Sequence, residues 1–99
     1  MRLKPGVRLG GVKPEVAIGM MCCEAAFAKL KMDFVITSVM DGKHKDGSKH
    51  YEGLAFDVRT RHIRPEHWNA VVNAIRDEIG DGFDVVLEGD HIHIEYDPK

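Results

Sequence analysis

The sequence predicts a single α+β domain, residues 1–99, with a mainly antiparallel four-stranded sheet and two helices on one face. The chain has 99 residues, which is the size of one domain. Two segments repeat apolar residues with the period of an α-helix, and four others have the β-rich composition or the alternation of strands. Gly89-Asp90 joins the last two strand segments in a hairpin turn, which makes that pair antiparallel.

The two predicted helices each begin at a proline. Residues 1–13 come before them and are expected to form an irregular N-terminal arm. Pro14 starts the first helix, whose apolar spacing continues to about Met32. Pro65 starts the second helix, and Gly80 is its expected C-terminal cap. The apolar faces consist of Val16, Met20, Cys23, Phe27 and Leu30 in the first helix, and of Trp68, Val71, Val72, Ile75 and Ile79 in the second.

Alternation along the strands separates a core face from an open face. The strands are expected at residues 34–39, 53–60, 83–88 and 91–96. Their apolar positions, such as Phe56 and Val58, would face the helices, because successive side chains point to opposite sides of a sheet. The open face then receives Asp57, Glu88, His91 and His93, with Glu88 and His91 as direct neighbours across the hairpin.

Composition and charge limit the possible partners. Hydrophobic residues make up 43% and charged residues 30% of the chain, a globular balance that argues against disorder, collagen and coiled coil. No apolar run is long enough to insert into a membrane, and residues 1–5 lack the apolar stretch of a signal peptide. The net charge of -2 lacks the excess of positive charge that is typical of nucleic-acid-binding domains. We expect a monomer, and we expect the adjacent Cys22 and Cys23 to be free thiols in a reducing compartment.

Histidine and carboxylate side chains on one sheet face suit Zn²⁺. A catalytic zinc takes three protein ligands and leaves a fourth position for water. We predict His50, Asp57 and His93 as the ligands, with the small residues Gly53 and Ala55 leaving room for the metal and a substrate.

A zinc ion in this position would lower the pKa of its bound water to about 7. Glu88 is the predicted general base, and His91 and His44 would stabilise charge on the tetrahedral intermediate. The alternative is an ordinary polar sheet face without a metal, because half-exposed strands alternate in the same way.

Two motifs resemble known families. Residues 48–57, Ser-Lys-His-Tyr-Glu-Gly-Leu-Ala-Phe-Asp, resemble the SxHxxGxAxD motif of the D-Ala-D-Ala metallopeptidases. A closer resemblance is to the signalling domain of the hedgehog proteins, through the HYEGxAxD pattern and through GFD, a glutamate and His-Ile-His in residues 82–93. That signalling domain shares the fold and the zinc site of the peptidases. The resemblance covers about residues 34–97, and it implies zinc ligands at His50, Asp57 and His93.

The resemblance also implies the other roles and one departure. His91 matches a residue beside the catalytic water, and His44 matches one that lines the cleft. The catalytic base of the hedgehog-like pattern matches Glu88 if one residue is deleted before His91. In several phage endolysins the base stands three residues before the last zinc ligand, which is the position of Asp90 here. The hairpin favours Glu88. Residues 37–42 lack the arginine that holds the substrate in many of the peptidases, so we expect His44 or Arg8 to replace it.

The implied function is a zinc peptidase that hydrolyses D-Ala-containing bonds of peptidoglycan, with a stem peptide as substrate. Whether it would be a D,D-carboxypeptidase or an endopeptidase stays open, and the alternative is a non-catalytic, hedgehog-like zinc-binding interaction module. The small size, without a wall-binding module, is typical of a phage product, so we expect a protein in the cytoplasm of a bacterial host or on a virion. Arg59, Arg61 and Arg64 are expected to form a solvated basic rim, or else to contact an anionic stem peptide.

Overall fold

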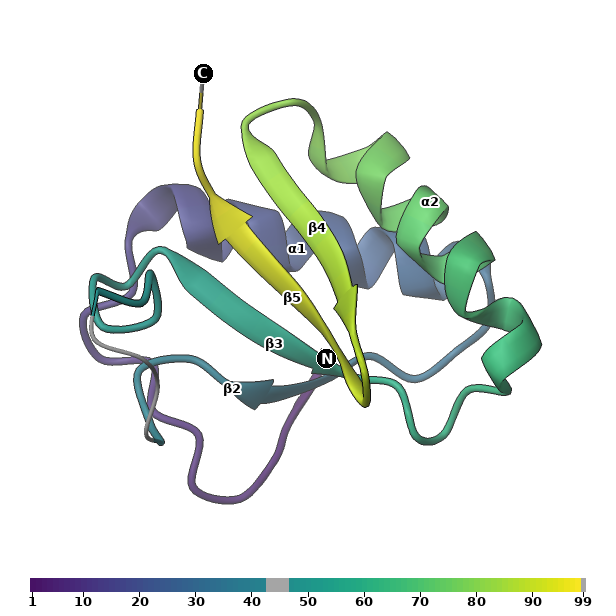
Figure 1. Cartoon of the computed structure of the whole chain (residues 1–99), viewed down its shortest axis with the longest axis horizontal. Coiled ribbons are helices and arrows are strands. Elements are labelled where there is room, and N and C mark those ends of the chain that lie inside the picture. Colours follow the sequence, from purple (N-terminus) through teal and green to yellow (C-terminus); the bar gives the residue numbers. More distant parts are fainter. Residues whose placement is uncertain (43–46, 99) are drawn as a thin grey trace.

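The computed structural model describes residues 1–42 and 47–98 (Figure 1). Its elements are β1 (Arg2–Leu3), α1 (Pro14–Lys29), β2 (Val35–Ser38), β3 (Ala55–Arg59), the 3₁₀ turn η1 (Pro65–His67), α2 (Trp68–Ile79), β4 (Phe83–Glu88) and β5 (His91–Tyr96). The order and class of these elements confirm the predicted α+β architecture, with α1 ending before Met32 and the second helix preceded by a 3₁₀ turn.

The sheet differs from the prediction in strand number and direction. It has five strands in the order β1-β2-β3-β5-β4, and β1 pairs with β2 in parallel while the other pairs are antiparallel. The prediction of four antiparallel strands was therefore incomplete, and residues 1–13 are not wholly irregular. The backbone N–H groups of Arg2 and Lys4 donate to the carbonyls of Phe34 and Ile36, at 2.8 and 2.9 Å. A strand of two residues is too short to show an alternation in sequence.

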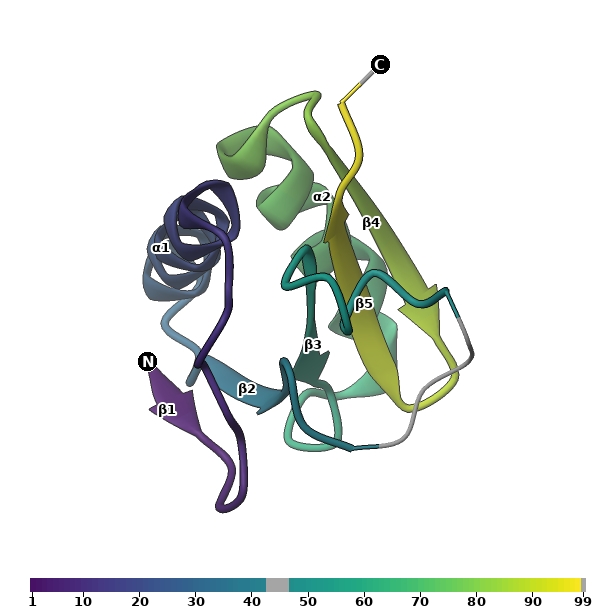
Figure 2. The same cartoon turned by 90° about the vertical axis from the view of Figure 1, so that its left-hand side faces the viewer.

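Both helices cover one face of the sheet (Figures 1 and 2). Their apolar sides pack against the sheet in one continuous core, which is what the helical spacing predicted. Phe56 and Val58 from β3, and Ile92 and Ile94 from β5, are fully buried in it. Among the described residues, no helix is long and apolar enough to span a bilayer.

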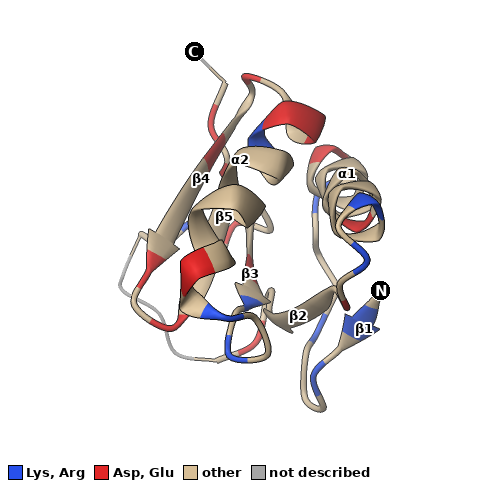
Figure 3. Cartoon of the chain, turned by 90° about the vertical axis from the view of Figure 1, so that its right-hand side faces the viewer, with Lys and Arg blue, Asp and Glu red and all other residues tan. Residues whose placement is uncertain are grey.

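The opposite face of the sheet remains open, and its register follows the predicted alternation. Asp57 pairs with His93 across β3 and β5, and Glu88 pairs with His91 across β4 and β5. Basic residues lie on β1 and in the loop after β3, and acidic residues lie in the turn between β4 and β5 (Figure 3). The open face thus combines histidines, carboxylates and a separate basic side.

Candidate metal centre

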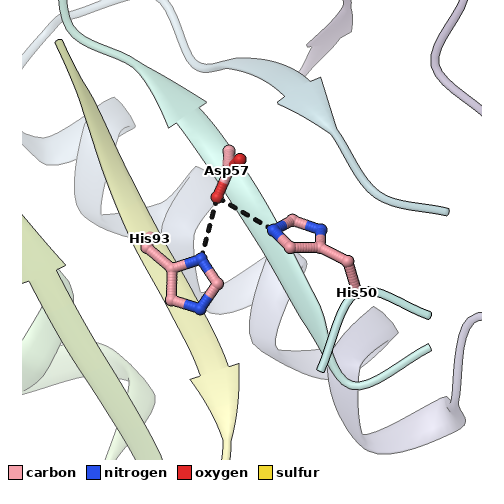
Figure 4. Close-up of side chains that lie close together, drawn as sticks. All are labelled: His50, Asp57 and His93. Atoms are coloured by element: carbon pink, nitrogen blue, oxygen red, sulfur yellow. Dashed lines mark hydrogen bonds and ion pairs between the residues drawn. The ribbon is translucent and has the colours of Figure 1, made fainter. Parts of the chain in front are cut away.

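The turn before β3, β3 itself and β5 bring His50, Asp57 and His93 together (Figure 4). Asp57 lies on β3, which has a paired strand on each side, and His93 faces it in register from β5. His50 comes from the turn before β3, where the N–H of Gly53 donates to the His50 carbonyl at 3.1 Å. Gly53 has φ +73°, and any Cβ there would collide with the Gly11 carbonyl oxygen, so only glycine closes this turn without strain.

Both imidazoles point a nitrogen at the same carboxylate oxygen. His50 Nε2 lies 3.2 Å from Asp57 Oδ1, and His93 Nδ1 lies 3.0 Å from it. His50 is 2% exposed and Asp57 is 8% exposed, so the cluster is shielded from bulk water. A tetrahedral metal ion with ligand distances of about 2.0–2.1 Å separates its ligand atoms by about 3.3 Å, close to these spacings. The group could therefore hold a metal ion.

The outer nitrogen of each ring is held by an acceptor. His50 Nδ1 donates to the Val39 carbonyl at 2.8 Å, and His93 Nε2 donates to Glu95 Oε1 at 2.8 Å. These bonds fix which nitrogen carries a proton and leave the inner nitrogen directed at Asp57. Metal-binding histidines are oriented in this way, by a carbonyl or carboxylate on the nitrogen away from the metal.

The charges of the group are strongly coupled. Burial favours the neutral form of Asp57, but hydrogen bonds from His50 and His93 outweigh it and hold the pKa of Asp57 well below its usual range. The hydrogen bond to Asp57 raises the pKa of His93 to about 9 against the effect of burial, and Glu95 adds to the rise. In the metal-free site, a proton on His93 Nδ1 occupies the space between the ring and Asp57, where a cation would compete with it.

The structure also brings Glu88 and His91 to the edge of this group. His91 Nε2 lies 3.5 Å from Glu88 Oε1 and 3.9 Å from Asp57 Oδ1, and Glu88 Oε1 lies 4.0 Å from His93 Nδ1. The Asp90 side chain is 97% exposed, and its Oδ1 lies 2.9 Å from His91 Nδ1, on the other side of that ring.

The remaining candidates are His44 and Arg8. His44 lies outside the described residues. Arg8, the other proposed substitute for the missing arginine, contacts the Met40 carbonyl at 3.5 Å and lines a separate cavity with Leu9 and Gly10.

Sequence reasoning missed the two outer partners of the histidines. Glu95 had a usable signal, because it lies two residues from His93 and therefore on the same face of β5. Val39 had none, since its contribution is a backbone carbonyl. A second acidic group, Asp84, Glu95 and Asp97, could also approach a cation, but Glu95 is already bonded to His93.

Comparison of the chain with protein-family models, with curated proteins and with solved structures gave no match. The geometry of the site, together with the motif resemblance, is therefore the basis for a functional proposal.

Proposed function

We propose that this protein is a zinc-dependent peptidase that hydrolyses D-Ala-containing peptide bonds of peptidoglycan. The observation that carries the proposal is the pair of histidines whose outer nitrogens are held by Val39 and Glu95 while their inner nitrogens converge on Asp57. Two imidazoles and one carboxylate form a ligand set typical of catalytic zinc, which keeps a further position open. The motif resemblance supplies the substrate class.

His50, Asp57 and His93 would hold the zinc ion. Bound zinc supplies a Lewis acid that lowers the pKa of water to about 7 and polarises a carbonyl oxygen. Glu88 lies on the same side of the group, and its half-exposed carboxylate is accessible to water, so it would accept the proton of the attacking water.

His91 would stabilise negative charge that develops on the substrate. Its Nε2 faces Glu88 and Asp57, and its Nδ1 is held by Asp90 at 2.9 Å. An imidazole N–H directed at the substrate from this position would donate to an oxyanion. Asp90 is then a positioning residue for His91, and Glu88 is the proposed base.

Two substitutions separate metal binding from catalysis. His93→Ala should lose zinc, whereas Glu88→Gln should keep one zinc ion per chain and lose peptide hydrolysis by about 100-fold or more. Zinc content is measured by metal analysis, and hydrolysis by amine released from peptidoglycan with and without a chelator. Glu66→Gln, a change at an exposed position within η1, is the control and should retain both properties.

Zinc-loaded wild type that releases no amine from several types of stem peptide would disprove the peptidase proposal. An active Glu88→Gln variant would disprove only the choice of base.

The second candidate is a zinc-binding interaction module without turnover. One observation favours it: the Glu88 side chain is 52% exposed, and its contacts with His91 and His93 are ion pairs of 3.5 and 4.0 Å, so its carboxylate is held loosely. This candidate predicts zinc binding and no released amine under any of the conditions above.

A further inference from the structure

A cavity of about 460 Å³ adjoins the candidate metal centre on the open face of the sheet. Asp57 of that centre, and His91 at its edge, both line the cavity. Its other walls come from β1, β2 and the end of β3, and include Val35, Thr37 and Arg59. A ligand that reaches the metal group can therefore extend toward β1.

Four basic residues line this cavity. Strand pairing positions two of them: Arg2 pairs with Val35 across β1 and β2, and Arg59 pairs with His91 across β3 and β5. Lys4 and Arg61 continue the same side and also line the cavity. The face is therefore basic beside β1, whereas the β4–β5 turn beyond His91 is acidic (Figure 3).

Among the described residues, none of these four cations has an acidic partner. Arg59 donates from Nε to His62 Nδ1 at 3.2 Å. Across residues 1–42 and 47–98, the side chains of Arg2, Lys4 and Arg61 form no ion pair. Two carboxylates also line the cavity, but Asp57 is bonded to His50 and His93, and Asp90 is bonded to His91. An excess of positive charge is left to face a ligand.

We propose that this cavity is a subsite that binds a carboxylate of the substrate, with Arg59 and Arg61 as its main contacts and with Arg2 and Lys4 at its rim. The inference rests on the proposed peptidase function. One residue of extended peptide spans about 3.5 Å, so a carboxylate one residue beyond a carbonyl held at the metal group would enter the basic cavity beside it. This distance favours a free C-terminal carboxylate over a more remote side-chain carboxylate. Because a carboxypeptidase substrate ends one residue beyond the cleaved bond, the subsite favours carboxypeptidase over endopeptidase activity.

Binding can be measured without turnover. N-acetyl-D-Ala-D-Ala is titrated into zinc-loaded Glu88→Gln protein and into metal-free wild type, and binding is followed by NMR chemical shifts. Its C-terminal amide serves as the uncharged probe. N-acetyl-D-Glu-D-Ala amide serves as a probe whose only carboxylate is on a side chain. We expect the acid to bind about tenfold more tightly than either amide, because guanidinium–carboxylate hydrogen bonds are charge-assisted.

Substitution of the arginines tests the assignment. In both protein forms, Arg59→Gln with Arg61→Gln should weaken binding of the acid by about tenfold and leave binding of its amide unchanged. Arg64→Gln is the matched control, because Arg64 follows in the same loop, pairs with Glu66 and does not line the cavity. Equal binding of acid and amide, or unchanged binding in the double variant, would overturn the subsite. Tighter binding of the side-chain probe would overturn the C-terminal assignment.

The zinc content of the double variant distinguishes this inference from the function on which it rests. Full zinc content with lost acid binding supports a subsite separate from the metal centre. Lost zinc together with lost binding would overturn that separation. If the wild type binds the acid as expected but hydrolyses no peptide, the peptidase proposal fails while the subsite remains.

Discussion

Asp57 is the residue on which the candidate centre depends, because one of its oxygens faces both histidines. Its place on the open face followed from the alternation of β3, since Phe56 and Val58 had to enter the core. The partners that orient the histidines were not predicted. The spacing of Glu95 from His93 places both on one face of β5, and the structure shows the Glu95 carboxylate at 2.8 Å from His93 Nε2.

Removing the charge of Glu95 should weaken metal binding without removing a ligand. Glu95→Gln is expected to lower zinc affinity by about 10- to 100-fold, because the carboxylate orients His93 and increases its basicity. Zinc affinity is measured by competition with a chelator of known affinity. Asp84→Asn is the control, since Asp84 pairs with Glu95 across β4 and β5 and changes the local charge equally. Equal losses in the two variants would show a general charge effect and contradict the role of the hydrogen bond.

The coupling of His93 to Asp57 predicts how the metal-free protein responds to pH. The pKa of His93 is raised to about 9, above the value of about 6.5 expected in the unfolded chain. Its contribution to stability is therefore complete below pH 6.5 and is lost as the pH rises through 9.

We expect the melting temperature in chelator to fall by at least about 4 °C between pH 6.5 and 9.5. His93→Gln should show a smaller fall over this range, and an equal fall in both proteins would contradict the assignment to His93.

The two adjacent cysteines should differ in reactivity. Cys23 is fully buried in the core, and burial raises the pKa of its thiol, so little thiolate forms at neutral pH. Cys22 is only partly buried. Native protein treated with iodoacetamide should therefore be modified first at Cys22, and both cysteines should react in denaturant. Peptide mass spectrometry measures the two sites, and faster native modification of Cys23 would contradict the packing of α1.

At the scale of elements, the turn before β3 positions His50. The spacing from His50 to Asp57 was visible in the sequence, but the reason for Gly53 was not. The structure shows its positive φ and its close approach to the Gly11 carbonyl. The N-terminal arm was also incompletely predicted, because β1 depends on hydrogen bonds to β2 rather than on a pattern of its own. Helices and the β4–β5 hairpin were predicted well because each has an apolar period and defined ends.

Two glycine substitutions separate backbone strain from steric contact. Gly47 and Gly53 both have positive φ, but a Cβ at Gly47 meets nothing within 4 Å, whereas one at Gly53 meets the Gly11 backbone. Gly47→Ala should cost about 1 kcal/mol of unfolding free energy, and Gly53→Ala at least about 2 kcal/mol. Gly53→Ala should also lower zinc affinity, because His50 is displaced with the turn. Urea unfolding measures the stabilities, and equal costs would contradict the close packing of Gly53 on the arm.

At the scale of the whole molecule, the helices cover one sheet face and leave the other for the candidate site. A chain of 99 residues buries a limited core, so a metal ion that joins the turn before β3 to β3 and β5 would add substantially to its stability. The sequence predicted this division between a core face and a site face. It did not predict that β1 would extend the open face and supply the basic side of the cavity.

Zinc should therefore stabilise the folded chain as a whole. A ligand present at 100 times its dissociation constant adds about 2.7 kcal/mol, which for a domain of this size raises the melting temperature by about 10–20 °C. Calorimetry with zinc, and then with excess chelator, measures the rise and its reversal.

The rise requires the three converging side chains, so His50→Ala should abolish it. His67→Asn, at an exposed histidine in η1, should preserve it. Stabilisation that persists in His50→Ala would place the bound zinc outside this centre. A wild-type melting temperature that zinc leaves unchanged would contradict zinc binding at His50, Asp57 and His93.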